Sequence, residues 1–450
     1  MESRRGRRDP AIAAFACLLA ALAPARSARA GAFDVEGAGP EGVAEVNARA
    51  ARSDDGMAAF LNPGGLGLGR GVRLALAPMI GISSLRAQGQ RQSLSDPVGI
   101  ALAFDATIPF EGALRDRIRI GFAGYLPPTT ALHLQTPKSD ALVFPYYANR
   151  TQRLVVMPAL AVRILDSLGI GIGLNVLGGV SGPATVVNGA SGAPEPRLDL
   201  NAATAVAIHA GLRFDPSPRV RLALAFRQKF SAPAAVDTKA IIAGIPLSVQ
   251  VATNAALFDP TTIVAAGSFD LGRATVEIDA SYAVWSAYDG PWVNVHATLP
   301  GVDVVSALPS SPAKDVVSLR GAGTYRFDVG AKSELVLRAG IGFEPTMLRD
   351  RQQGVTNLVD GDKLLFGLGA SFALRGVLPF TLRFSAGGNV QRVFPYAQDK
   401  IACKVAPCPA DTVSGPDAAK PAEGITNPGF PKLEGQGAFW SLALGVGVEL

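Results

Sequence analysis

The chain has 450 residues, of which 48% are hydrophobic, only 18% are charged and 50 are glycine. This apolar surplus is unusual for a water-soluble protein, but a β-barrel with a lipid-facing outer surface requires it. A soluble chain of this length would be expected to divide into about three domains. No linker-like change in composition separates such domains, so one large closed sheet is the simpler interpretation.

Residues 1–30 have the features of a secretory signal peptide. Four arginines lie between positions 4 and 8, an apolar stretch covers residues 11–23, and Ala28-Arg29-Ala30 forms a small-residue cleavage site. The segment contains six arginines and two acidic residues, so its removal lowers the net charge from +5 to +1. The basic charge therefore belongs mostly to the signal peptide and does not indicate nucleic-acid binding.

The segment covering residues 31–66 differs in character from everything that follows it. It is rich in small residues and ends in the turn-like sequence Asn62-Pro63-Gly64-Gly65. Apolar residues recur in it at helical spacing, at Val43, Val46, Ala50 and Ala51. We predict that residues 31–70 form a partly helical plug, and that residues 71–450 form a barrel that encloses it.

Strand-like alternation of apolar and other residues recurs along the remainder of the chain, in about fourteen segments. These segments are 72–80, 98–106, 116–125, 152–164, 168–180, 198–214, 219–230, 262–270, 273–286, 315–328, 334–343, 363–375, 380–391 and 437–449. The clearest begins at Arg219, where four large apolar residues share one face and three arginines share the other. A strand buried on both faces would not tolerate those arginines.

The same division between two faces recurs in residues 275–284 and 363–375. One face suits lipid and the other suits a polar lumen. After the signal peptide, no uninterrupted run of 18 apolar residues could form a spanning helix. An exported, apolar chain of this kind indicates a transmembrane antiparallel β-barrel in the bacterial outer membrane, because a closed barrel satisfies every backbone hydrogen bond within lipid.

The connections between the strands alternate in length. Short turns such as Asp166-Ser167 and Leu271-Gly272 are interleaved with long connections at 81–97, 126–151, 181–197, 231–261, 287–314, 344–362 and 392–436. Outer-membrane barrels distribute long outer loops and short periplasmic turns in this way. An even number of strands would place both ends of the barrel on the periplasmic side. The alternative, a secreted soluble β-sandwich or propeller, would need a second sheet or a repeated blade motif, and neither is evident.

Aromatic residues near strand ends would form the girdles of such a barrel at the membrane interfaces. The sequence offers only a thin set of candidates, Trp285, Trp292, Trp440 and Tyr125.

Signals for enzyme chemistry are weak. The three histidines, at 133, 209 and 296, are isolated, so neither a metal site nor a Ser-His-Asp triad is indicated, and His209 is interpreted as a lumen or packing residue. The match to G-x-G-x-x-G at residues 37–42 contains Pro40 and follows no strand, so it does not indicate a dinucleotide site. Glu277 and Asp279 share a strand face, and we interpret them as hydrogen-bonded lumen charges rather than catalytic acids. We expect no enzyme activity, no metal and no cofactor.

Several fragments, taken in order, resemble the FadL-type outer-membrane transporters of long-chain fatty acids and other hydrophobic compounds. The start of the plug and its end, Asn62-Pro63-Gly64-Gly65-Leu66, are similar to the N-terminal hatch of that family, whose signature has Ala where this chain has Gly64. Three further fragments carry the resemblance: the turn and strand at 218–227, the Trp-Ser strand end at 276–288, and the late strand pair at 337–345 and 360–363.

The resemblance implies a 14-strand barrel plugged by a hatch, and an apolar ligand site reached from the outer loops. Its ligand would be a long-chain fatty acid or another hydrophobic small molecule. The hatch residues implied in ligand binding or gating are Phe33, Asn62, Pro63 and Gly64. Release would follow a rearrangement of the hatch and a lateral opening near a kink in the third strand, where Gly121 and Gly124 would permit the kink. The protein is expected to contact outer-membrane lipid and to be monomeric.

Two other functions are open at this stage. A general diffusion porin for polar solutes would need an open, charged constriction, and the segment before the first strand argues against it. A lipid-modifying barrel enzyme would need a nucleophile and a base, for which no pattern is present. In either case, Cys403 and Cys408 lie in a Pro-rich loop of an exported chain, and we predict a disulfide between them.

Overall fold

The structure of the chain is a computed structural model. It describes residues 32–92, 94, 96–128, 142–148, 150, 153–188, 194–198, 201–242, 245–299, 302–305, 311–349, 351–353, 356–376, 379–401 and 429–450. The predicted signal peptide, Gly31, and the predicted disulfide partners Cys403 and Cys408 lie outside these ranges. Strands make up 62% of the structure, which confirms the prediction of an all-β protein.

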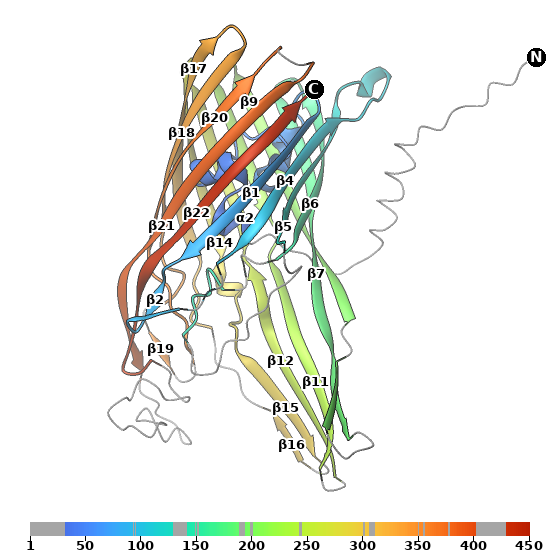
Figure 1. Ribbon diagram of the computed structural model, residues 1–450, viewed down its shortest axis with the longest axis vertical. Coiled ribbons are helices and arrows are strands. Elements are labelled where there is room, and N and C mark those ends of the chain that lie inside the picture. Colours follow the sequence, from blue (N-terminus) through green and yellow to red (C-terminus); the bar gives the residue numbers. More distant parts are fainter. Residues whose placement is uncertain are drawn as a thin grey trace, which may run out of the picture.

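Fourteen antiparallel strands close into one barrel, as the sequence predicts (Figure 1). In their order around the barrel they are β1 (Arg73–Ser83), β4 (Val98–Thr107), β5 (Ile118–Leu126), β6 (Val155–Leu165), β7 (Leu168–Asn188), β9 (Asn201–Ser217), β10 (Val220–Arg227), β13 (Thr261–Asp270), β14 (Ala274–Val284), β17 (Val316–Gly330), β18 (Ser333–Glu344), β20 (Lys363–Leu374), β21 (Thr381–Ile401) and β22 (Lys432–Glu449). The barrel is closed by β22, which pairs with β1 from Arg73 opposite Glu449 to Ser83 opposite Phe439. Each strand thus corresponds to one alternating segment of the sequence.

The two rims of the barrel differ, as the connection lengths indicate. The short turns, the start of β1 and the end of β22 lie at one rim, which is uppermost in Figure 1. A 3₁₀ turn, η1 (Gly112–Leu114), lies in the connection between β4 and β5 at this rim. The long connections all leave the opposite rim. We refer to the two as the short-turn rim and the long-loop rim.

Several of the predicted long loops contain strands, and here the prediction was wrong. The additional strands are β2 (Arg86–Ala87), β3 (Gln90–Arg91), β8 (Pro194–Leu198), β11 (Phe230–Ile242), β12 (Ile245–Asp259), β15 (Val293–Leu299), β16 (Val302–Val305) and β19 (Gln352–Gln353). Strands β11, β12, β15 and β16 pair in this order into an arm that continues beyond the long-loop rim (Figure 1). These strands find their hydrogen-bond partners in one another and in β7, and a pattern read within one segment does not reveal such partners.

The outer surface of the barrel is apolar and the inner surface is polar or small. On β14, Val276 and Ile278 face outward and are 40% and 57% exposed, whereas Thr275, Glu277 and Asp279 are buried. Leu222, Leu224 and Phe226 on β10 and Leu368 on β20 are likewise exposed. A soluble sandwich would bury these side chains, so the outer surface favours a lipid environment.

The prediction of an aromatic girdle is wrong for three of its four residues. Tyr125, Trp285 and Trp292 are buried inside the molecule, and only Trp440 is exposed on the outside, at 49%. A position near a strand end does not determine the face on which the residue lies, because a shift of one residue along a strand changes the face.

An arginine on the lipid-facing surface is expected to test the membrane environment of the barrel. We expect Ile278→Arg to lower the free energy of unfolding by about 2–4 kcal/mol, because Ile278 lies in the middle of an outward strand face. Val329→Arg is the matched control: Val329 is 59% exposed but lies at the end of β17, at the short-turn rim, where the expected loss is about 0–1 kcal/mol. Urea unfolding in lipid vesicles measures both. Equal, small losses would contradict a membrane-spanning barrel.

The N-terminal segment lies inside the barrel as short helices joined by irregular chain (Figure 1). The helices are α2 (Ala32–Glu36), α3 (Gly39–Ala44), α4 (Ala58–Leu61) and α5 (Pro63–Leu66). Helix α3 contacts β20, β21 and β22, and α5 contacts the opposite part of the wall, from β5 to β9. We refer to residues 32–70 as the plug.

The helical periodicity predicted across residues 43–51 is wrong beyond Ala44. Val46 and Asn47 have φ angles of 47° and 64°, which end the helix. The turn is held by the buried Asn47 amide, which accepts a hydrogen bond from the Ala38 N–H at 2.9 Å and donates one to the Phe33 carbonyl at 2.8 Å. A chain that must follow the inside of a barrel wall is shaped by such contacts rather than by local helix propensity.

None of the helices in the described part of the chain has the length and apolar character needed to cross a membrane.

Candidate functional site: the plugged lumen

Asn62 fixes the end of the plug to the wall. Its side-chain oxygen caps α5 by accepting a hydrogen bond from Gly64 N–H at 3.1 Å, and its amide donates to the carbonyls of Ala50 at 2.9 Å and Leu212 at 3.1 Å. The side chain is fully buried. The side-chain contact to nearby backbone is thus as predicted, and Asn62 also connects two parts of the plug to strand β9.

The sequence Asn62-Pro63-Gly64-Gly65 forms the start of a helix instead of the predicted turn, and neither glycine has a positive φ angle. Pro63 occupies the first helical position, where its fixed φ and missing N–H are tolerated. Gly64 is required by a close approach, because a Cβ atom there would lie 2.7 Å from the carbonyl oxygen of Gly211 in β9. This segment is therefore pressed against the wall.

Phe33 belongs to an apolar cluster that joins the plug to β5. Its ring lies 5.3 Å from that of Phe60 and 6.1 Å from that of Tyr125, measured between centroids, and all three rings are buried. Aromatic pairs at these separations contribute about 0.5–1.5 kcal/mol each beyond the area that they bury. Phe33 thus holds the first helix of the plug in place.

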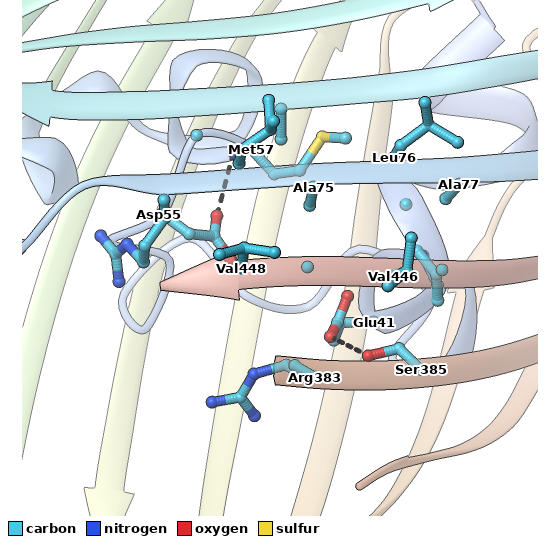
Figure 2. Close-up of a pocket in the computed structure, with 18 of the residues that line it drawn as sticks. Glu41, Asp55, Met57, Ala75, Leu76, Ala77, Arg383, Ser385, Val446 and Val448 are labelled. Carbon is cyan, nitrogen blue, oxygen red and sulfur yellow. Dashed lines mark hydrogen bonds between the residues drawn. The ribbon is translucent and has the colours of Figure 1, made fainter. Parts of the chain in front are cut away.

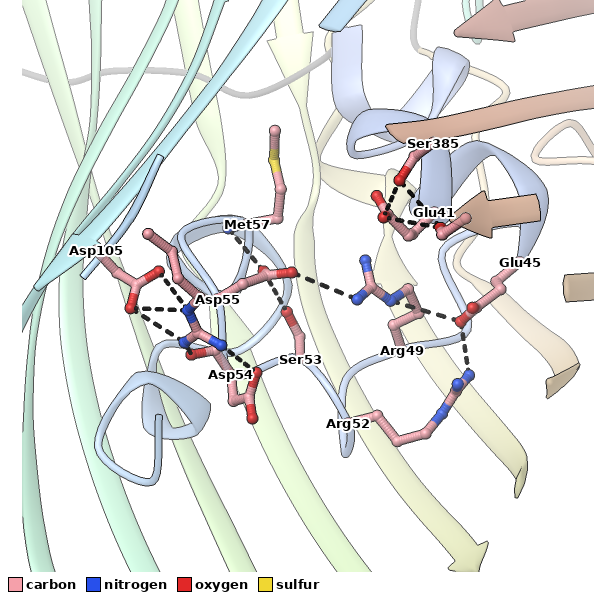
Figure 3. Close-up of polar contacts among 12 residues, drawn as sticks. Glu41, Glu45, Arg49, Arg52, Ser53, Asp54, Asp55, Met57, Asp105 and Ser385 are labelled. Atoms are coloured by element: carbon pink, nitrogen blue, oxygen red, sulfur yellow. Dashed lines mark hydrogen bonds and ion pairs between the residues drawn. The ribbon is translucent and has the colours of Figure 1, made fainter. Parts of the chain in front are cut away.

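A buried ionic group surrounds Glu45 of the plug, and Figure 3 shows its contacts with Arg49 and Arg52. The carboxylate of Glu45 pairs with Arg52 at 2.6 Å, with Arg338 of β18 at 2.7 Å and with Arg49 at 3.5 Å. Burial by itself raises the pKa of Glu45, but the three guanidinium groups outweigh it, so the pKa lies below its ordinary value.

Glu277 and Asp279 of β14 hold the irregular chain between α3 and α4. Glu277 accepts hydrogen bonds from the Ala51 N–H at 2.7 Å and from Arg52 Nε at 2.6 Å, and Asp279 accepts one from the Ala50 N–H at 3.3 Å. The interpretation of these two residues as hydrogen-bonded lumen charges is therefore confirmed. His209 also lies inward and is 1% exposed, as expected for a lumen residue.

A second ionic group lies near the short-turn rim. Arg73 of β1 pairs with Asp54 of the plug and with Asp105 of β4, both at 3.0 Å, and Arg119 of β5 also pairs with Asp105. Glu41 of α3 accepts a hydrogen bond from the Ser385 hydroxyl of β21 at 2.8 Å. Burial raises the pKa of Glu41, but nearby Arg338 and Arg49 outweigh it and lower the pKa to about 2.

A cavity of about 70 Å³ lies on the long-loop side of the plug. Its walls combine aromatic rings, such as those of Phe60, Tyr146 and Trp285, with charged groups. The three guanidinium groups that line it are all paired: Arg150 with Asp259 at 2.9 Å and Asp34 at 3.3 Å, Arg227 with Asp34 at 2.9 Å, and Arg320 with Glu344 at 3.2 Å. Each of these guanidinium groups therefore has a carboxylate partner, with Asp34 shared by Arg150 and Arg227, and Asp259 shared by Arg150 and Arg153.

Glu36 lies at the end of α2 and has no cationic partner among the residues that the structure describes. Its side chain is fully buried, and its only described side-chain hydrogen bond is from the Tyr125 hydroxyl at 3.4 Å. Burial raises the pKa of Glu36 to about 8, although that hydrogen bond opposes the shift. At neutral pH the carboxyl group is therefore largely uncharged, which suits its buried position beside Tyr125.

The glycines predicted to kink the third strand lie in an unbroken ladder. Strand β5 pairs with β4 and with β6 without a shift of register. Gly121 faces the plug, and a Cβ atom there would lie 2.5 Å from the Leu66 side chain, whereas at Gly124 it would meet the Phe122 ring at 2.8 Å. Both glycines thus permit close packing, and a lateral opening at this strand stays a prediction.

Sequence reasoning missed most of the charged residues that hold the plug, among them Arg52, Glu45 and Arg338. For wall residues such as Arg338, the only signal available was a charged residue on a strand face that otherwise carries small residues. Glu45 and Arg52 lie in the plug, where no strand pattern applies. Within the part of the chain that the structure describes, no group of three or more His, Cys, Asp or Glu side chains is arranged to hold a metal ion.

Comparison with known structures relates this barrel to solved ones. A crystal structure of a Pseudomonas aeruginosa FadL homologue matches with a TM-score of 0.53 and 14% identity, over 94% of this chain and 99% of that chain. The CymD monoaromatic hydrocarbon channel matches over the same shares, with a TM-score of 0.52 and 14% identity. The P. putida toluene transporter TodX matches with a TM-score of 0.50 and 13% identity, over 88% of this chain and 94% of its own. No protein-family model and no curated protein sequence matches the chain.

Proposed function

We propose, from the fold that this chain shares with the FadL homologue and with the CymD and TodX channels, that it is a channel for small hydrophobic molecules in a bacterial outer membrane. The apolar outer surface supports the membrane location, because it would be costly to expose to water. The plug supports a gated route in place of an open pore, because it contacts the wall on opposite sides of the lumen.

The observation that carries the proposal is the cavity on the long-loop side of the plug, in which every lining guanidinium is already paired. An ionic ligand would need an unpaired charge of opposite sign, and each guanidinium there already has a carboxylate partner. An uncharged molecule needs only the aromatic and apolar wall, and it gains about 0.8 kcal/mol for each CH₂ group that it buries. We therefore favour uncharged hydrophobic compounds, and keep long-chain fatty acids as the second candidate because of the sequence resemblance.

Transport requires the plug to move, and its anchors to the wall are hydrogen bonds and ion pairs. Asn62, Glu277 and the group around Glu45 hold it to walls on different sides of the barrel. A ligand that binds better to a displaced plug would shift the balance toward the open state. In this proposal Phe33, Asn62, Pro63 and Gly64 control the position of the plug, and release follows its rearrangement, either into the periplasm or laterally beside Gly121 and Gly124.

Uptake by cells that express the protein tests the proposed function. We expect radiolabelled toluene to accumulate faster than in cells with an empty vector, with saturation, and a small polar sugar to show no difference. Faster uptake of the sugar would overturn the proposal in favour of a general porin. Accumulation of labelled oleate without any effect on toluene would favour the second candidate.

A further inference from the structure

A second cavity, of about 100 Å³, lies on the opposite side of the plug, near the short-turn rim. It lies between the plug and strands β21, β22, β1 and β4, which are neighbours around the closing seam of the barrel (Figure 2). We refer to this cavity as the seam chamber. None of the residues named above as hatch or kink residues lines it.

The floor of the seam chamber consists of the smallest side chains. The strand registers place Gly447 between Arg383 of β21 and Ala75 of β1, and place Ala75 opposite Ala103 of β4. The next inward row contains Ser385, Gly445, Ala77 and Ala101. Six glycine or alanine residues on adjacent strands leave a hollow that larger side chains would fill.

Gly447 has room for a side chain. A Cβ atom built there would lie 3.5 Å from the Leu74 carbonyl oxygen, 3.6 Å from the Ala75 Cβ and 4.0 Å from the Arg383 Cβ, which are ordinary contact distances. Its neighbour Gly445 differs, because a Cβ atom there would lie 2.8 Å from the ring of Pro40. Pro40 therefore closes one side of the chamber, and Met57 of the plug covers another part of it (Figure 2).

The charged groups that line the chamber carry no surplus of positive charge for an anion. Arg73 pairs with Asp105, Asp55 pairs with Arg49 at 3.5 Å, and the Glu41 carboxylate accepts a hydrogen bond from Ser385. The last two charged groups, Arg383 and Glu449, are opposite in charge and lie on the paired strands β21 and β22. An anionic ligand would therefore find more carboxylates than guanidinium groups.

We propose that the seam chamber is a second binding site, for one small uncharged apolar molecule about the size of a single aromatic ring, on the periplasmic side of the plug. An apolar cavity of about 150 Å³ is large enough to bind benzene, and the seam chamber is of the same order. The assignment deepens the proposed function and rests on it, since the molecule would reach the chamber after it passes the plug.

Methionine methyl groups provide a direct probe of the chamber. The chain has five methionines. Met57 lines the chamber, whereas Met347 is buried in an apolar cluster with Tyr146 and Trp285, toward the long-loop rim. In detergent-solubilised protein labelled with ¹³C at the methionine methyls, we expect toluene to shift the Met57 signal saturably through its ring current. A Met57→Leu variant assigns the signal, and Met347 reports any general effect of toluene on the micelle.

Two glycine substitutions complete the test. Gly447→Leu fills the chamber and is expected to abolish the Met57 shift. Gly323→Leu is the matched control, because Gly323 lies on the outer face of β17, where the nearest atom to an added Cβ is 4.0 Å away, and the shift should persist. A Met57 shift that survives in Gly447→Leu, or no saturable shift in the unsubstituted protein, would overturn the seam chamber.

The ligand class and the proposed function are tested separately. Benzoate at pH 7.5 should leave the Met57 signal unchanged, and a saturable shift by benzoate alone would overturn the assignment to uncharged ligands. Toluene uptake without a saturable Met57 shift would remove the seam chamber and leave the proposed function intact. A saturable Met57 shift that Gly447→Leu abolishes, without any toluene uptake, would keep the seam chamber and remove the proposed function.

Discussion

Deletion of residues 31–60 is expected to convert the protein into an open, ion-conducting pore. These residues contain most of the plug, including the buried Phe33, Phe60 and the ionic group around Glu45. Without them, the inward charges of β14 and β18 would face water instead of the plug. Such a polar lumen of a closed 14-strand barrel would conduct ions, whereas the intact protein should conduct little.

Planar lipid bilayer recordings measure this effect directly. The barrel should still assemble, because its strands pair with one another all the way around to the β1–β22 seam, and a different migration of heated and unheated protein in mild SDS would show that it has. If the deletion variant assembles and conducts no better than the intact protein, residues 31–60 do not close the pore. The proposal of a movable plug would then fail.

Glu45→Ala is expected to release the plug without damage to the barrel. The substitution leaves three buried arginines without this carboxylate, and removal of one partner from a buried ion pair costs about 3–5 kcal/mol. Only Arg338 among these three belongs to the wall, and the β17–β18–β20 ladder that holds it does not depend on Glu45. The loss should therefore appear as weaker docking of the plug.

Proteolysis of the plug and spontaneous conductance would both increase in Glu45→Ala. Asp328→Ala is the matched control, because Asp328 also pairs with an arginine, Arg273 at 3.8 Å, but both side chains are more than 60% exposed. An exposed pair contributes about 0–1 kcal/mol, so this variant should behave like the parent. A Glu45→Ala plug that stays protease-resistant and closed would show that the ionic group does not hold it.

The sequence alone determined the barrel. An environment with lipid on one side and a polar lumen on the other imposes a period of two on every strand, so segments such as residues 275–284 could be identified one at a time. The lengths of the connections then determined which rim holds the chain ends. Even the role of Glu277 and Asp279 as hydrogen-bonded lumen charges followed, because an acid on a buried strand face needs a partner.

Only the tertiary structure determined which groups are partners. Glu277 binds the backbone of Ala51, 226 positions earlier in the chain, and no local pattern indicates that pairing. The same is true of the arm strands, and of Tyr125 and Trp285, which lie inside and not in a girdle. The helix predicted through residues 43–51 ends at Val46, because the plug must follow the wall that surrounds it. Periodicity reports the environment of one segment, whereas the plug and its two cavities depend on which distant segments the closed barrel brings into contact.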